Sequence, residues 1–259
     1  MTGKTTITGK RNEKTGTDTF RLNSCLQGDT AGLRVVEPDN FDNPGKEVKI
    51  LFILPVDPAG NHEHGDGLKA VRKTNLHTEL GLILATPEFC ALPWYCDNSN
   101  SGQKDESFLL NDILPLLDRN YPAKKTTRLL LGFSKSGWGA LSLLLRHPEL
   151  FAAAAAWDAP LMQETTDDYG MNEAFGSMEN FNKYRIPLLL KEKSPLFAKE
   201  KRIALSGNSL FGEQMEQAHR LLNSLGIPHD WDNSTKREHK FGSGWEREAI
   251  LSLDRMSKA

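Results

Sequence analysis

Short apolar runs alternate along the chain with longer stretches in which apolar residues recur at helical spacing. Each run is bounded by glycine, proline or polar clusters, which is typical of a buried strand. The predicted strands cover residues 48–54, 81–86, 127–131, 151–157, 203–206 and 227–231. The predicted helices cover residues 67–80, 107–120, 137–146, 213–225 and 245–256. Strands that are apolar throughout and separated by helices predict an α/β fold, with a mostly parallel central sheet and helices on both faces.

The beginning of the chain follows a different pattern. Residues 20–26 and 32–36 predict the two strands of a hairpin, with a turn at residues 27–29. Residues 1–18 are polar and are predicted to form a flexible segment. Because no linker-like stretch divides the rest of the chain, residues 19–259 are predicted to form a single domain.

Proline and glycine set the predicted limits of several elements. Pro87 is expected to stop the strand at 81–86, and Pro115 is expected to kink the helix at 107–120. Gly226 is expected to end the helix that precedes it, because glycine readily adopts the left-handed conformation of a helix C-terminus.

Composition and charge exclude several classes of function. The chain of 259 residues is 38% hydrophobic and 25% charged, which is typical of a globular protein with a sizeable core. Its net charge of −2 produces no overall field for nucleic acid or an acidic membrane surface, so neither is an expected partner. The longest apolar runs fall far short of the ~20 residues that span a bilayer. The first residues also lack the apolar segment of a signal peptide. The compartment and the oligomeric state stay open.

The chain has three cysteines, Cys25, Cys90 and Cys96. This number is too small for a disulfide framework or a cysteine metal cluster, so no metal site is expected. Free buried thiols are the preferred interpretation, and a Cys90–Cys96 bridge is the alternative.

The stretch GFSKSGWGA, from Gly132 to Ala140, joins a predicted strand to a predicted helix. A nucleophile on such a turn needs small residues two positions before and two after it, because the backbone must fold sharply. Ser134 meets this condition with Gly132 and Ser136, whereas a nucleophile at Ser136 would place Trp138 in the corner. A phosphate-binding loop would need glycine directly before the Lys-Ser pair, where Ser134 stands. Ser134 is therefore the predicted nucleophile, and the alternative is that the glycines only shape a turn.

The sequence GFSKSGWGAL resembles the nucleophile turn of the "Putative esterase" branch of the α/β-hydrolases, which includes esterase D and the enterochelin esterases. That branch has the pattern G-x-S-x-G-G-x-G-A-L, so Ser136 is the single departure. The resemblance extends from about Leu33 to the final helix and is strongest at the turn. It implies an α/β-hydrolase fold and serine esterase chemistry without a metal or an organic cofactor.

A serine nucleophile needs a general base, and in this fold the order along the chain is serine, acid, histidine. His62, His64 and His77 precede the serine. His147 is expected to cap the end of the helix at 137–146, and His219 and His229 lie within a predicted helix and a predicted strand. His239 lies in a polar loop before the last helix, and with Trp245 it is similar to the family's histidine with a tryptophan a few residues on. Arg237 and Glu238 stand where the family has glycines. His239 is the predicted base, and an exposed loop histidine is the alternative.

Two carboxylates are candidates for the acid that orients this histidine. The family usually has Asp or Glu shortly after the strand at 203–206, but Asn208 and Ser209 stand there in this chain. Glu213 follows at the start of a helix, where a negative charge is favourable in any case. Asp158 ends the strand that follows the nucleophile's helix. Asp158 is the preferred acid and Glu213 is the alternative.

The oxyanion hole is expected to use the backbone N–H of Lys135 and one N–H from the loop after the strand at 48–54. That loop reads PVDPAG, and its prolines have no N–H, so Val56 and Asp57 are the available donors. The family pattern favours Asp57, with Val56 as the alternative. The stretch NHEHGDG at residues 61–67 is expected to border the substrate or to be a flexible polar loop.

Four aromatic residues near predicted strand ends are candidates for the floor of an aromatic or sugar-ester pocket, or else for plain core: Trp94, Tyr95, Trp138 and Trp157. The sequence as a whole predicts a serine hydrolase that cleaves small-molecule carboxylic esters through a Ser-His-acid triad and an acyl-enzyme. The alternatives are acyl transfer to an alcohol on the same fold, and a hydrolase-fold binding protein without catalysis.

Overall fold

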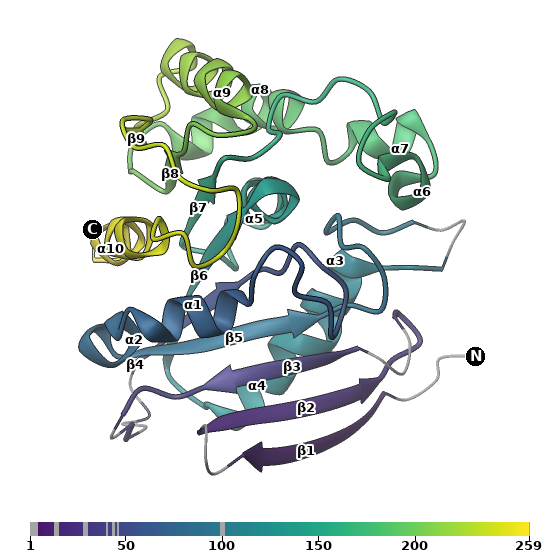
Figure 1. The fold of residues 1–259 in the computed structure, drawn as a ribbon, viewed down its shortest axis with the longest axis vertical. Coiled ribbons are helices and arrows are strands. Elements are labelled where there is room, and N and C mark those ends of the chain that lie inside the picture. The colour runs from purple at the N-terminus through teal and green to yellow at the C-terminus, as the bar shows by residue number, and fades with distance from the viewer. Residues whose placement is uncertain are drawn as a thin grey trace.

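A central sheet organises the molecule, which a computed structural model describes for residues 5–12, 16–27, 31–39, 41–42, 45, 47–98 and 102–258. In these residues nine strands form one sheet with the order β1-β2-β3-β5-β4-β6-β7-β8-β9 (Figure 1). The strands are β1 Thr6–Asn12, β2 Thr17–Asn23, β3 Gly32–Val36, β4 Glu47–Ile53, β5 Leu82–Glu88, β6 Lys125–Phe133, β7 Ala153–Trp157, β8 Ile203–Ser206 and β9 His229–Asp232.

Strand direction divides the sheet into two parts. From β5 through β4, β6, β7 and β8 to β9, neighbouring strands are parallel. On the other side, β1, β2, β3 and β5 pair antiparallel. In the parallel part, Leu131 of β6 lies opposite Ile53 of β4 and Ala155 of β7. The predicted mostly parallel α/β sheet is therefore confirmed, and the parallel strands carry their carboxyl ends to the same edge.

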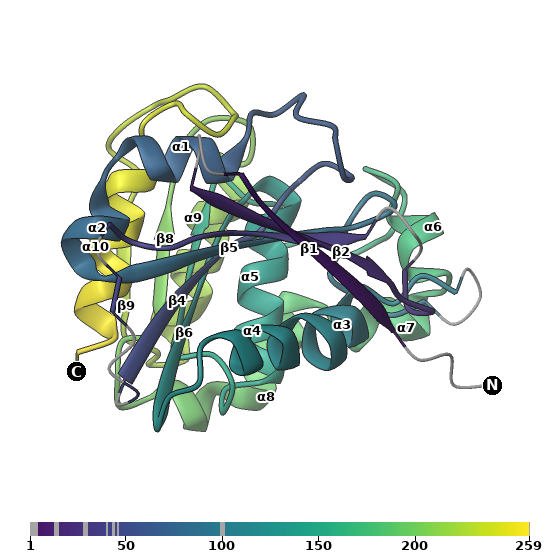
Figure 2. The ribbon, with the colours of Figure 1, turned by 90° about the horizontal axis from the view of Figure 1, so that it is seen from below.

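Helices cover both faces of the sheet. The segments are α1 Gly67–Lys73, α2 Leu76–Leu80, α3 Asp105–Phe108, the π-helical turn η1 Leu109–Ile113, α4 Leu114–Asn120, α5 Ser134–Arg146, α6 Met171–Phe175, α7 Met178–Asn182, α8 Ile186–Phe197, α9 Gly212–Ser224 and α10 Glu246–Met256. Helices α1, α2 and α10 lie on one face, whereas α5, α8, α9 and the α3–α4 segment lie on the other (Figure 2).

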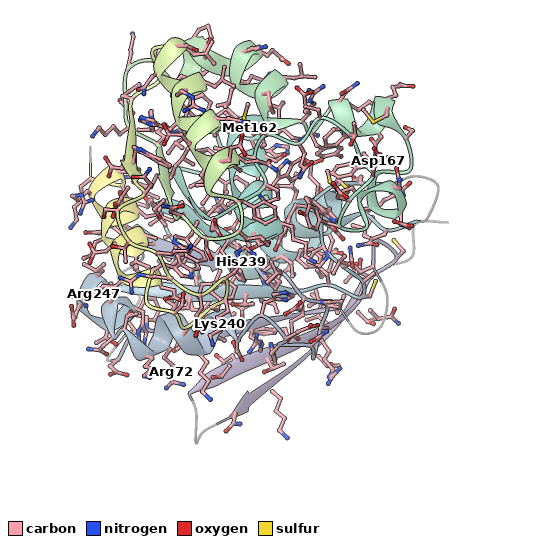
Figure 3. The ribbon with its side chains drawn as sticks, turned by 45° about the horizontal axis from the view of Figure 1, so that its top comes forward. Arg72, Met162, Asp167, His239, Lys240 and Arg247 are labelled. Atoms are coloured by element: carbon pink, nitrogen blue, oxygen red, sulfur yellow. The ribbon has the colours of Figure 1, made fainter. Side chains whose placement is uncertain are left out.

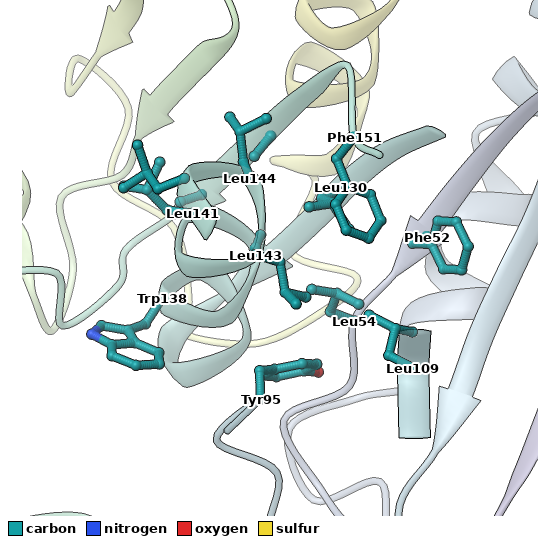
Figure 4. Close-up of a cluster of buried hydrophobic side chains, with 14 of the residues drawn as sticks. Phe52, Leu54, Tyr95, Leu109, Leu130, Trp138, Leu141, Leu143, Leu144 and Phe151 are labelled. Carbon is teal, nitrogen blue, oxygen red and sulfur yellow. The ribbon is translucent and has the colours of Figure 1, made fainter. Parts of the chain in front are cut away.

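The central strands are apolar on both faces because each face is covered. Along β6, Leu129 and Leu131 pack on the side of α1 and α10, whereas Leu130 between them packs on the side of α5. Leu130 belongs to a cluster with Phe52 of β4 and Leu143 of α5, beside which the nucleophile turn begins (Figure 4). Each fully buried side chain of this size stabilises the fold by about 1.5–3 kcal/mol relative to exposure. The core therefore holds β6 and α5 rigidly against each other.

The N-terminal residues contain a strand that the hydrophobic pattern did not predict. Strand β1 pairs with β2, from Thr6 opposite Asn23 to Asn12 opposite Thr17. It is an edge strand, and its described side chains are mostly exposed, so it has no apolar face. The predicted hairpin strands are observed as β2 and β3, and their predicted turn at residues 27–29 lies partly outside the described residues.

Three details depart from the predicted elements. Strand β5 continues through Pro87, because the register with β4 ends at Ala85 and beyond it β5 is paired with β3 alone. The predicted helix at 67–80 is divided, because Asn75 adopts a left-handed conformation with φ 62°. The irregularity expected at Pro115 occurs in the turn before it, where η1 interrupts the α-helical pattern.

Segments α6, α7 and α8 were not predicted, and they occupy the chain between β7 and β8.

In the described residues no helix is both long and apolar enough to cross a bilayer, and no group of three or more His, Cys, Asp or Glu side chains is arranged to hold a metal ion. The three cysteines are free thiols, as expected, but only Cys96 is buried: Cys90 is partly exposed, and Cys25 is exposed in the loop after β2.

Candidate active site

Ser134 lies on a strained turn at the carboxyl end of β6, where α5 begins. Its φ of 52° is in the left-handed region, which a serine adopts only when the surroundings impose it. A Cβ on Gly132 would lie 2.2 Å from the Ser136 carbonyl oxygen, so the turn requires glycine there. The structure thus places the predicted nucleophile on a tight turn between a strand and a helix, with its residue at the N-terminus of α5.

Ser136 occupies the position where the family pattern has glycine, and its side chain is fully buried. Its hydroxyl accepts from the backbone N–H of Phe133 at 3.0 Å and donates to the carbonyl of the same residue at 2.9 Å. A Cβ on Gly137 would lie 2.9 Å from the Cβ of Ala159, so the next position must be glycine. Serine at position 136 therefore fits the turn and also stabilises it through two hydrogen bonds to the backbone of Phe133.

His239 and Asp158 are brought together from loops 81 positions apart in the sequence. The Nδ1 atom of His239 lies 2.6 Å from Oδ2 of Asp158. The aspartate side chain is 0% exposed and the histidine side chain 18%. A carboxylate that accepts from Nδ1 holds the proton on that nitrogen, which leaves Nε2 as an acceptor in the neutral ring. Figure 3 shows His239 near the middle of its view, next to Lys240 on the loop that precedes α10.

The carboxylate of Asp158 is bound by three backbone N–H groups at the end of the β8–α9 connection. Its carboxylate accepts from Ser209 at 3.1 Å, from Leu210 at 2.8 Å and from Phe211 at 2.9 Å. Burial opposes ionisation, but the bonds from His239 and from the three N–H groups outweigh it and hold the pKa of Asp158 below its usual value. The residues that follow β8, where the family pattern places its acid, here donate hydrogen bonds to the carboxylate of the residue directly after β7.

Glu213, the alternative acid, lies elsewhere. It is exposed in the first turn of α9, and its carboxylate accepts from Gln217 Nε2 at 3.4 Å, one turn further along the same helix. Its position matches the favourable role of a negative charge at a helix N-terminus.

The loop after β4 lies beside the nucleophile turn. Its start is joined to β6 by a bond from Leu54 N–H to the Leu131 carbonyl at 2.9 Å. The buried Tyr95 hydroxyl donates to the Pro55 carbonyl at 2.6 Å, and its ring packs so closely on α5 that a Cβ on Gly139 would clash with it. Tyr95 thus fixes the loop of the predicted oxyanion donors relative to the helix that carries Ser134.

Val56, Asp57 and Lys135, the three candidate oxyanion donors, differ in their side-chain surroundings. The buried Asp57 carboxylate accepts from the backbone N–H of His64 at 3.0 Å and contacts Nδ1 of the same residue at 2.9 Å. Burial lowers the pKa of the Lys135 ammonium, although the charges of Asp57 and Glu63 act in the opposite direction. The Asp57 carboxylate is thus hydrogen-bonded by His64, a residue of the same loop.

A cavity of about 340 Å³, the Ser134 cavity, opens at the edge of the sheet where the parallel strands have their carboxyl ends. Its lining residues are Val56, His64, Leu92, Trp94, Ser134, Lys135, Pro160, Tyr169, Leu210, Phe211 and His239. The predicted nucleophile and the predicted base therefore meet the same space. Of the two candidate loop donors, Val56 lines it directly.

Several lining residues gave no signal in the sequence. Leu92, Tyr169 and Leu210 are exposed apolar or aromatic residues in irregular segments, where no periodic pattern marks them. Of the four aromatic candidates, Trp94 lines the cavity. Trp138 is fully buried and packs against Trp94, with the two ring centroids 5.6 Å apart. Trp157 stacks on Trp245 at an interplanar angle of 6° and also packs against the imidazole of His239. Tyr95 belongs to the hydrophobic core.

The other histidines have structural partners or surface positions. His147 ends α5, as predicted, and its Nε2 contacts Glu106 at 2.7 Å. His219 and His229 contact each other at 2.8 Å and do not line the Ser134 cavity. His64, which the sequence placed only before the nucleophile, lines the cavity together with His239.

Comparisons with known proteins relate this chain to esterases. Residues 93–220 match the model of a protein family described as "Putative esterase". Two esterases of Mycobacterium tuberculosis, from strains CDC 1551 / Oshkosh and H37Rv, are each 24% identical to this chain over 153 residues, or 54% of this chain and 32% of the relative. The matched part of this chain thus corresponds to about a third of the length of these curated relatives.

Solved structures match the chain over nearly its whole length. FphF, a fluorophosphonate-binding serine hydrolase of Staphylococcus aureus, superposes with a TM-score of 0.68 at 15% identity, covering 98% of both chains. A ferulic acid esterase gives a TM-score of 0.67 at 16% identity, covering 98% of this chain and 97% of the other. An S-formylglutathione hydrolase from Agrobacterium tumefaciens gives 0.66 at 12% identity, with coverages of 97% and 95%. At such identities the likeness establishes a shared fold.

Proposed function

Because the chain belongs to the "Putative esterase" family of α/β-hydrolases, we propose that it hydrolyses small-molecule carboxylic esters with Ser134, His239 and Asp158 as a catalytic triad. The observation that carries this proposal is the 2.6 Å contact between His239 Nδ1 and the buried Asp158 carboxylate. It is supported by the strained elbow at Ser134 and by the cavity that Ser134 and His239 share.

In the first half of the reaction Ser134 Oγ attacks the ester carbonyl, while His239 Nε2 takes the hydroxyl proton as general base. Asp158 holds the ring in the tautomer that leaves Nε2 free and stabilises the imidazolium that forms. The backbone N–H of Lys135 and that of Asp57 or Val56 bind the oxyanion, assisted by the positive end of the α5 dipole. His239 then returns its proton to the leaving alcohol.

The second half repeats these roles with water. His239 takes a proton from a water molecule that attacks the acyl-enzyme, the same N–H groups bind the second oxyanion, and Ser134 leaves with the proton from His239. Phe133, Trp157 and Phe211 surround the imidazole with ring centroids 5.2, 6.1 and 5.6 Å from its own. This aromatic wall keeps the ring in place through both halves.

A fluorophosphonate probe and a panel of nitrophenyl esters with graded acyl lengths test the proposal. The wild type should bind one equivalent of probe at Ser134, and Ser134→Ala should lose both labelling and hydrolysis, on the order of 10⁶-fold in kcat. Ser136→Ala is the matched control, because it removes the neighbouring hydroxyl and keeps the nucleophile.

Other outcomes would redirect the assignment. Hydrolysis that survives in Ser134→Ala would refute the nucleophile. A wild type that neither reacts with the probe nor turns over any ester would favour a binding protein on this fold. Transfer products that exceed hydrolysis when alcohols are added would identify an acyltransferase that uses the same residues.

A further inference from the structure

A second histidine–aspartate pair reaches the Ser134 cavity from the loop after β4. Asp57 receives both the backbone N–H and the ring Nδ1 of His64, at 3.0 and 2.9 Å. The His64 side chain is 40% exposed, lines the cavity and has no assigned role in the reaction above. The site thus contains one imidazole more than the proposed chemistry requires.

The Asp57 contact decides what this imidazole presents. With the proton held on Nδ1 toward a carboxylate, the neutral ring carries a lone pair on Nε2. Among the residues that the structure describes, Nε2 of His64 has no hydrogen-bond partner. His64 therefore offers the cavity an oriented acceptor.

The loop that carries His64 is tied to the loop of His239. The backbone N–H of Phe241 donates to the His64 carbonyl at 2.8 Å. Gly65 has φ 88°, and a Cβ there would lie 2.6 Å from the Phe241 carbonyl oxygen, so the two loops touch backbone to backbone. The Phe133 ring lies 6.5 Å from the imidazole of His64 and 5.2 Å from that of His239, between centroids. The acceptor is thus held in a fixed place relative to the catalytic ring.

The lining of the cavity combines apolar and polar residues. One set of residues is apolar or aromatic: Val56, Leu92, Trp94, Pro160, Leu210 and Phe211. The polar lining besides Ser134 and His239 consists of Tyr169 and of His64 and Lys135, which both lie near the Asp57 carboxylate. Lys135 can only donate, whereas neutral His64 can only accept through Nε2.

A hydroxyl group satisfies both of these partners, because it donates one hydrogen bond and accepts another. We propose that His64 is a specificity-determining residue that accepts a hydrogen bond from a hydroxyl group of the ester substrate, while the apolar lining residues of the cavity contact the rest of the molecule. This inference rests on the proposed ester hydrolysis at Ser134, and it adds the class of substrate: hydroxyl-bearing esters.

Two matched pairs of esters test it. In one pair the acyl chain ends in a hydroxyl or in a methoxy group, and in the other the alcohol half is 2-hydroxyethyl or 2-methoxyethyl. The wild type should prefer the hydroxyl member of at least one pair by roughly tenfold in kcat/KM, the value of one net hydrogen bond. In His64→Phe, which keeps a ring but removes the acceptor, that preference should fall to within about twofold while the methoxy ester is still hydrolysed.

The loop supplies a matched control. His62 also faces a carboxylate, with Nε2 3.9 Å from Asp66, but it does not line the Ser134 cavity. His62→Phe should keep the full preference, and His64→Gln, whose amide oxygen can accept, should recover part of it. A loss of folding would lower turnover of both esters, whereas the ratio isolates recognition.

Two results would overturn the inference while leaving the hydrolase intact: no hydroxyl preference in either pair, or a preference that persists in His64→Phe. Failure of the proposed function is a different result, in which the wild type hydrolyses none of the four esters or Ser134→Ala hydrolyses them as well as the wild type.

Discussion

Two histidine–aspartate pairs meet the same cavity, and they differ in what holds the carboxylate. Asp158 is fully buried, and besides His239 it accepts three backbone N–H groups from the β8–α9 connection. In the described part of the chain, Asp57 is bound by His64 alone, through the ring and the N–H of the same residue. The contact distances are similar, 2.6 and 2.9 Å.

This difference indicates that a histidine–carboxylate contact does not by itself identify a catalytic base. Charge that develops during a reaction is stabilised best by groups that are already oriented and excluded from water. The imidazole of His239 is enclosed by aromatic rings, whereas that of His64 is half-exposed on a surface loop. The first arrangement suits proton transfer, and the second suits recognition of a polar group.

A third pair shows the same contact outside the lining of the Ser134 cavity. Glu106 contacts His147 Nε2 at 2.7 Å and accepts from Arg146 at 2.8 and 2.9 Å and from the Tyr184 hydroxyl at 3.0 Å. This network joins α3, the end of α5 and the segment before α8, so its role is to hold helices together.

The largest expected difference between the two pairs is the loss of kcat when each histidine is replaced by alanine. His239→Ala should lower kcat on the order of 10⁶-fold, and combining it with Ser134→Ala should cost nothing further, because the two residues act as a unit. His64→Ala should retain hydrolysis of simple nitrophenyl esters. If His239→Ala stays active and His64→Ala does not, the two roles are exchanged.

Changing each aspartate tests the carboxylates in the same way. Asp158→Asn should reduce kcat on the order of 10⁴-fold, because the amide favours the wrong tautomer of His239. Asp57→Asn should cause a far smaller loss, and Glu213→Gln should change little, since its charge contributes only about 0.3–1 kcal/mol at a helix end. Steady-state rates on one nitrophenyl ester measure all three, and a large loss in Glu213→Gln would refute the choice of acid.

The structural pair should control stability and its pH dependence rather than rate. Burial opposes ionisation of Glu106, but His147 and Arg146 outweigh it and lower its pKa from 4.5 to about 2. A lowered carboxyl pKa stabilises the fold above pH 4.5, by about 3 kcal/mol, and this contribution disappears as the pH falls toward 2. The difference in unfolding free energy between the wild type and Glu106→Gln should therefore be largest at neutral pH and shrink between these values. Denaturant titrations at several pH values measure it, and a difference that is constant with pH would contradict the assignment.

The smallest expected effect on activity comes from changing the turn at residues 132–136, where the Phe133 ring packs against both His64 and His239. Ser136→Ala removes the bonds to the backbone of Phe133 in a buried site, which should cost about 1–3 kcal/mol of stability. Because Phe133 lies between the two imidazoles, kcat and the hydroxyl preference should change together and modestly. Thermal unfolding and the matched esters report both quantities, and a selective loss of either one would show that the turn controls the two pairs separately.

Local pattern was sufficient for the central parallel strands and for the turn at Ser134. The central strands are apolar on both faces, so they stand out as short runs, and the turn at Ser134 depends on residues within a few positions of one another, such as Gly132 and Ser136. His239 could also be selected, because the other histidines fall before the serine or within regular elements.

Local pattern was insufficient where partners are distant in the sequence. Strand β1 has no apolar face, because it is stabilised by pairing with β2 at the sheet edge. Asp158 is separated by about 50 positions from the N–H groups that hold it, and nothing near Glu213 indicates that it would lie on the exposed side of α9.

The sequence by itself determined the α/β order, the elbow and the candidate nucleophile and base, because local sterics and hydrophobic periodicity control them. The tertiary structure alone decided which carboxylate contacts His239 and brought His64 into the same cavity. Both outcomes depend on loops that the folded sheet brings together at one edge, and the free energy of such contacts exists only once the sheet has formed.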